Sequence, residues 1–93
     1  MTDYGIKIVG YGLTQVHPPE WVVEFDPNRH APGKPYPTGF LVSDADPAKA
    51  QRFATAGEAM SLVREQSTAC PLRPDGRVNR PLMAFTTAIE PLP

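Results

Sequence analysis

The chain has 93 residues, of which 41% are hydrophobic and 20% charged, and its formal net charge is −1. This length and composition suit one folded domain over residues 1–93 and exclude a largely disordered chain. No apolar run approaches the roughly 18 residues that cross a bilayer, and a lone cysteine, Cys70, agrees with a reducing compartment, so we expect a cytoplasmic protein without membrane contact.

Twelve prolines divide the chain, which is about two and a half times the average usage. Because proline fixes φ and lacks a backbone N–H, regular elements are expected where proline is absent. Four proline-free stretches carry alternating or β-branched hydrophobic residues. They predict strands at residues 4–11, 21–26, 39–43 and 82–90.

The first two predicted strands show the alternation that is typical of half-buried strands. In the first strand, Ile6 and Ile8 share one face. In the second strand, we expect Trp21, Val23 and Phe25 to point into the core, with acidic side chains on the opposite face.

Two connections surround the second strand. Residues 12–20 contain two prolines and are expected to form the loop that returns the chain antiparallel to the first strand. Residues 26–39 contain four prolines and are longer than a typical connection, so they form either a binding surface or a purely structural loop. Within them, Tyr36 lies between two prolines that keep its backbone extended, which makes it an exposed candidate for partner contact.

The third and fourth predicted strands flank a helical segment. In the third strand, Phe40 and Val42 are expected to point inward. In the fourth, Phe85 and Ile89 are expected to share the buried face. The residues between these strands lack a strand pattern and carry two signals for helix starts.

A capping box gives the clearer of these signals. Thr55 and Glu58 are spaced so that each side chain can accept a hydrogen bond from a free backbone N–H, which contributes about 1 kcal/mol. This predicts a helix of about eleven residues with Ala56 as its first residue. Steps of about 100° per residue place the following apolar residues on one face: Ala56, Ala59, Met60 and Val63, with Leu62 at the margin.

The dipeptide Asp46-Pro47 is the second start signal, because Asp caps helices and Pro is tolerated at the first helical position. Two interpretations follow. Residues 47–66 form one helix, or a single turn over residues 47–50 and an extended piece over residues 51–53 precede a separate helix. We favour the second interpretation, because a capping box within a helix would find no free N–H groups.

These elements predict an α+β fold in the order β-β-β-α-β. A helix of about eleven residues is marginal alone in water, so its apolar face must pack on something, and four strands supply a sheet. We expect one small domain with an antiparallel or mixed sheet and one amphipathic helix packed on one face. An open edge of that sheet would also permit a homodimer.

Two segments carry a resemblance to a known group of proteins. Residues 46–53, DPAKAQRF, fit the pattern D-P-x-x-A-x-R-F, and residues 73–82, RPDGRVNRPL, fit R-P-D-G-x-x-N-R-P-L. With both segments, the stretch 38–90 resembles small uncharacterised proteins encoded by bacteriophages and prophages. The resemblance implies a phage origin and a bacterial host cell, and it implies no particular chemistry. A small accessory protein that acts by binding fits that origin.

The densest group of polar side chains precedes the last predicted strand, and its members are Arg73, Asp75, Arg77, Asn79 and Arg80. Three guanidinium groups on one loop can bind carboxylates or phosphates through forked hydrogen bonds. The structural alternative is that Asp75 and Asn79 shape turns, while an arginine pairs with a carboxylate or bonds the last carbonyls of the helix.

The sequence shows no clear catalytic, metal or nucleotide motif, so we expect no enzyme activity, no cofactor and no metal. The leading hypothesis is a non-enzymatic phage or prophage accessory protein that binds a host or phage protein through this cluster, through the proline-rich loop that contains Tyr36, or through an open sheet edge. The alternative is a small nucleic-acid-binding protein that uses the arginine-rich loop 73–80. Absence of aromatic residues interleaved with the arginines weakens this alternative.

Overall fold

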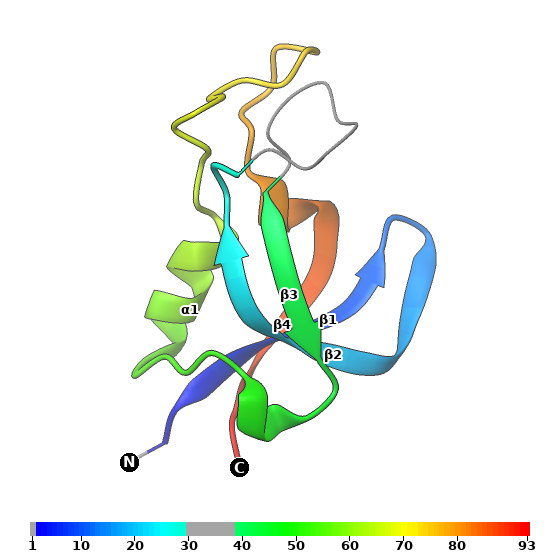
Figure 1. Cartoon of the computed structure of the whole chain (residues 1–93), viewed down its shortest axis with the longest axis vertical. Coiled ribbons are helices and arrows are strands. Elements are labelled where there is room, and N and C mark those ends of the chain that lie inside the picture. Colours follow the sequence, from blue (N-terminus) through cyan, green and yellow to red (C-terminus); the bar gives the residue numbers. More distant parts are fainter. Residues whose placement is uncertain (1, 30–38) are drawn as a thin grey trace.

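Four strands form one antiparallel sheet in the order β3-β2-β1-β4 in the computed structural model, which describes residues 2–29 and 39–93 (Figure 1). The strands are β1 (Tyr4–Tyr11), β2 (Thr14–Asp26), β3 (Phe40–Asp44) and β4 (Phe85–Pro91). One helix, α1 (Ala56–Val63), packs on the sheet, and 3₁₀ turns at Pro47–Lys49 and Pro81–Ala84 flank it in sequence. The predicted α+β class is confirmed for a small single domain, and the predicted β-β-β-α-β order omitted the two turns.

The capping box starts α1 where the sequence predicts it. Thr55 Oγ1 accepts a hydrogen bond from the Glu58 backbone N–H at 3.1 Å. In return, the Glu58 carboxylate accepts one from the Ala54 N–H at 3.1 Å. One backbone donor of the first helical turn and one just before the cap are thereby satisfied. The helix ends at Val63 and is shorter than the expected eleven residues.

The segment before α1 follows the broken interpretation. Asp46 caps the first 3₁₀ turn by accepting a hydrogen bond from the Ala48 N–H at 2.9 Å. The chain then extends, and Phe53 exchanges two backbone hydrogen bonds with Tyr4, at 2.8 and 2.9 Å. This extra pairing holds the entry to the helix against the start of β1.

The main core lies between α1 and the sheet. Its buried members come from β1, β2, α1 and the second 3₁₀ turn: Ile6, Ile8, Val22, Ala59, Val63 and Leu82. The predicted pair Ile6 and Ile8 is therefore confirmed. Ala59 and Val63 are buried and Met60 packs against this core, which confirms three of the four residues of the predicted helix face, whereas Ala56, in the first turn, is exposed.

A bulge in β2 changes which side chains share a face. Pairing with β3 shifts register at Val23, so this residue is an insertion in the strand. Val22 and Phe25 therefore both contact the main core, while Trp21 packs in a separate small cluster. The prediction that Trp21, Val23 and Phe25 share one face is wrong, although Trp21 is buried as expected at 7% exposure.

β2 also extends through residues that were expected to form a loop, including Pro18 and Pro19. Its pairing with β1 jumps from Glu20 to Gln15, so both prolines fall where the ladder is interrupted. Their missing N–H groups therefore cost no ladder hydrogen bond, which explains why a strand tolerates them.

In β3, Leu41 contacts the main core, and the expected inward pair Phe40 and Val42 is wrong. Leu41 pairs directly with Phe25 across the two strands, and direct partners point to the same side of a sheet. β4 begins later than expected because a 3₁₀ turn precedes it. Its two predicted inward residues do pack against the core: Phe85 and Ile89. Within the described residues, no helix is long and apolar enough to cross a membrane.

Candidate functional site: an arginine hairpin beside an apolar cavity

The arginine-rich segment folds into a small hairpin that projects away from α1 and the sheet, drawn in yellow and orange in Figure 1. Arg73 O accepts a hydrogen bond from Gly76 N at 2.9 Å, and Arg73 N donates to Arg77 O at 2.8 Å. Gly76 has a φ of 85°, a left-handed conformation that three-residue hairpin loops require and that glycine adopts readily. Residues 74–76 therefore form a tight turn, in which Asp75 lies as the structural alternative expects.

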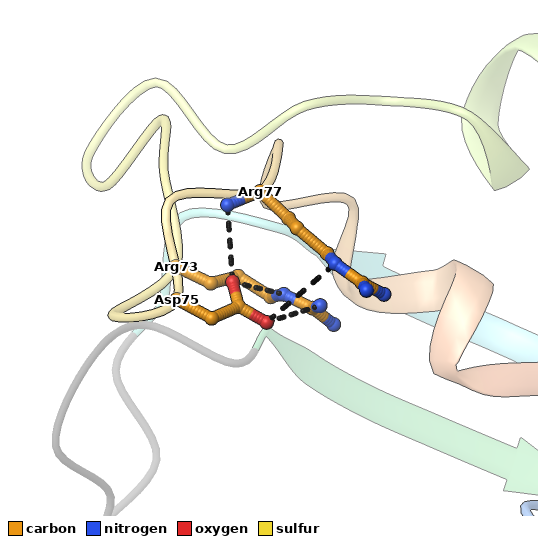
Figure 2. Close-up of polar contacts among 3 residues, drawn as sticks. All are labelled: Arg73, Asp75 and Arg77. Carbon is orange, nitrogen blue, oxygen red and sulfur yellow. Dashed lines mark hydrogen bonds and ion pairs between the residues drawn. The ribbon is translucent and has the colours of Figure 1, made fainter.

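Asp75 fixes the tip of this hairpin by binding two arginines (Figure 2). Its carboxylate accepts hydrogen bonds from Arg73 Nε at 3.3 Å and Nη2 at 2.7 Å, and from the Arg77 backbone N–H at 3.0 Å. The bond from the Arg77 N–H, helped by the charge of Arg73, lowers the pKa of Asp75 below its usual value of 3.8. The carboxylate therefore stays ionised at neutral pH and holds the Arg73 side chain and the Arg77 backbone in place.

Asn79 holds the base of the hairpin and is only 2% exposed. Its Nδ2 donates to Cys70 O at 2.9 Å, its backbone N–H donates to Pro71 O at 2.9 Å, and its carbonyl accepts from Ser67 N at 2.9 Å. Ser67, which is also buried, accepts a hydrogen bond from Cys70 N through its hydroxyl at 3.1 Å. The Asn79 side chain thus organises the loop from within, as the structural alternative states.

A second anchor comes from the connection that follows β2. The Asn28 side-chain oxygen accepts hydrogen bonds from the backbone N–H groups of Thr68 at 2.6 Å and Ala69 at 3.2 Å. It also accepts from the hydroxyls of Ser67 at 3.2 Å and Thr68 at 3.1 Å. One oxygen therefore gathers four donors and joins segments about forty residues apart in sequence.

Two of the three arginines remain available for an external ligand. Arg80 is exposed, and no hydrogen bond or ion pair connects its side chain to another residue in the described part of the chain. The Arg77 guanidinium makes a 4.0 Å contact with Asp75, and its side chain is 80% exposed. Three arginines and one aspartate give this region a charge of +2, on a chain whose formal net charge is −1.

A cavity of about 510 Å³ lies beside these arginines, within the roughly 300–1,000 Å³ range of ligand pockets. Arg73, Arg77 and Arg80 lie along its lining. The apolar part of the lining comes from all four strands, the hairpin and the second 3₁₀ turn: Tyr11, Phe25, Leu41, Val78, Met83 and Phe85. Two of these rings, Tyr11 and Phe85, stack at a tilt of 44° with centroids 5.0 Å apart.

Gly39 permits the close packing behind this cavity. It has a φ of 84°, and a Cβ at this position would lie 2.8 Å from the Phe25 ring and 3.2 Å from Pro81. A larger residue would push the start of β3 away from the end of β2. The cavity thus depends on a backbone conformation that favours glycine.

Half of the apolar side chains named in the lining are exposed. In the described part of the chain, five large hydrophobic side chains are exposed, and three of them line the cavity: Tyr11 at 56%, Val78 at 42% and Met83 at 53%. Single exposed hydrophobic residues are common, but their clustering marks an interaction site.

The structure brings the predicted polar residues together, and the sequence prediction missed the apolar half of the site. The three arginines and Asn79 line one cavity, and the side chains of Asp75 and Asn79 also bond within the loop. Tyr36, the remaining predicted contact, lies outside the described residues. The sequence signal for the apolar half is weak, since Tyr11 and Met83 stand at ends of elements where alternation does not predict exposure.

No protein-family model matches the chain, and no curated protein or solved structure matches it. Among residues 2–29 and 39–93, no group of three or more His, Cys, Asp or Glu side chains is placed to hold a metal ion. The geometry of the hairpin and the cavity is therefore the basis for assigning a function.

Proposed function

We propose that this chain is a non-enzymatic accessory protein of the phage or prophage type, which acts in the bacterial cytoplasm by binding a host or phage protein. The observation that carries this proposal is that exposed apolar side chains and the exposed arginines Arg77 and Arg80 line the same cavity. Protein interfaces combine an apolar centre with arginine, and those residue types supply much of the binding energy. The hairpin is held by Asp75 and Asn79, so little order has to be gained on binding.

Affinity capture from a bacterial host lysate, followed by mass spectrometry, tests the proposal. The informative variant is the double substitution Arg77→Ala and Arg80→Ala, which leaves Arg73 in place to pair with Asp75. We expect this variant to lose the partner without a change in thermal unfolding. Arg64→Ala, at the exposed end of α1, is the matched control and should retain the partner. Equal capture by wild type and the double variant would refute the proposal.

A nucleic-acid-binding protein is the alternative use of the same surface. One arginine of the loop 73–80 is already paired, Arg73 with Asp75 at 2.7 Å, and outside the loop Arg52 is paired with Asp3 at 2.9 Å. An arginine that is paired with a carboxylate is less available to contact a phosphate, and phosphate contacts supply most of the non-specific affinity for nucleic acids. Retardation of an oligonucleotide in a low-salt gel shift, lost steeply as salt rises, would favour this alternative.

A further inference from the structure

We infer that the partner presents a short acidic segment with one large apolar side chain. The apolar side chain enters the cavity, and a neighbouring carboxylate pairs with Arg80 and Arg77. This inference rests on the proposed function and specifies the chemistry of the partner at the same site.

The cavity explains why the segment carries a large apolar side chain. Tyr11, Val78 and Met83 are between 42% and 56% exposed, so an apolar group placed against them removes water from both surfaces. Met83 adds adaptability, because an unbranched thioether can repack around anchors of different shape. The tilted rings of Tyr11 and Phe85 offer a flat apolar wall, which suits an aromatic or long aliphatic anchor.

The arginines explain why the segment is acidic. No side chain or backbone group of residues 2–29 and 39–93 engages the Arg80 guanidinium, whose five donors form a fork that matches a carboxylate. Arg77 offers a second exposed guanidinium on the same lining. The neighbouring cation Arg73 is engaged by Asp75 on two donors and serves to position the hairpin.

Two observations favour a peptide over a nucleic acid. The chain carries a formal net charge of −1, where a strongly basic surface is usual for nucleic-acid binding. Finally, the cavity beside Arg77 and Arg80 is lined on its other sides largely by apolar side chains.

Selection from a library of random short peptides against the intact protein tests this inference. We expect the enriched peptides to share an acidic residue within a few positions of Trp, Phe, Leu or Met. A fluorescein-labelled copy of the best peptide then gives a Kd by polarisation, and its affinity should fall as salt rises, since exposed ion pairs are screened.

Matched substitutions place the peptide in the cavity. Met83→Glu should weaken binding about tenfold or more, the loss expected for a central anchor contact. Leu13→Glu is the control, because Leu13 is fully exposed and is not part of the cavity lining, and it should leave Kd unchanged. Val78→Glu provides a second test at the cavity if the first variant fails to fold. Arg80→Gln should weaken binding several-fold, while Arg64→Gln should not.

Several results would overturn the inference: no enriched peptide, enriched peptides without the acidic and apolar pair, or equal effects of Met83→Glu and Leu13→Glu. A second test uses an oligothymidylate in place of the peptide. If it binds more tightly than the peptide and Met83→Glu weakens its binding equally, a nucleic-acid base occupies the cavity instead of a peptide side chain. If lysate capture depends on Arg77 and Arg80 but the selected peptides lack an apolar residue, this inference fails and the proposed function stands. If peptides bind as expected but the double variant at Arg77 and Arg80 captures the same proteins from lysate as wild type, the proposed function fails.

Discussion

Replacement of Asn79 by Ala separates structural from contact roles within the arginine-rich segment. The change removes the hydrogen bond from Nδ2 to Cys70 O, which measures 2.9 Å, at a residue that is 2% exposed. Loss of one hydrogen bond costs about 0.5–1.5 kcal/mol, and a carbonyl left unpaired in a buried site brings the cost to about 1–3 kcal/mol. Against a total stability of about 5–15 kcal/mol for a small domain, this is a large effect.

Urea unfolding followed by tryptophan fluorescence measures this loss. Trp21 is the single tryptophan and is buried at 7% exposure, so its emission reports global unfolding. The control is Arg77→Ala, which changes an exposed side chain in the same hairpin and should stay within about 0.5 kcal/mol of wild type. A stable Asn79→Ala protein that has lost its partner would refute the reasoning and make Asn79 a contact residue.

Three further predictions concern the core, the helix and the hairpin tip. Leu82→Ala should lower the free energy of unfolding by about 2–5 kcal/mol, because Leu82 is completely buried in the main core. An unchanged free energy of unfolding in urea would contradict this packing. Thr55→Ala should lower the free energy of unfolding by about 1 kcal/mol, because it removes the cap of α1. Ser61→Ala, on the exposed helix face, should lower it less, and thermal unfolding of both variants measures the difference. The lowered pKa of Asp75 means that its contribution to stability is present above about pH 3.8 and lost as pH falls through the lower folded-state value. The difference in Tm between wild type and Asp75→Asn should therefore vanish in strong acid, and a difference that persists there would exclude this linkage.

Local signals made the helical region predictable. The Thr55 and Glu58 pair and the Asp46 cap each act over a few residues, so their sequence spacing determines their geometry. The turn that contains Gly76 is local for the same reason, because a positive φ at that position selects glycine. Features of this kind need no knowledge of the distant parts of the chain.

Strand faces and the cavity depended on contacts that the sequence does not encode locally. The bulge at Val23 appears only when β2 pairs with β3, and it moves Val22 into the core in place of its neighbour. The two prolines in β2 are tolerated because of an interruption in the pairing with β1. The site combines side chains from all four strands with the hairpin, so its apolar half is visible only after the chain has folded.

The four bonds to the Asn28 side-chain oxygen also have a dynamic consequence. Segment 67–69 cannot open toward solvent while these bonds remain, and breaking them frees the start of the connection after β2 at the same time. The amide protons of Thr68 and Ala69 should therefore exchange with solvent deuterium as one cooperative unit. A cavity occupant that stiffens the adjoining hairpin would slow both exchange rates together.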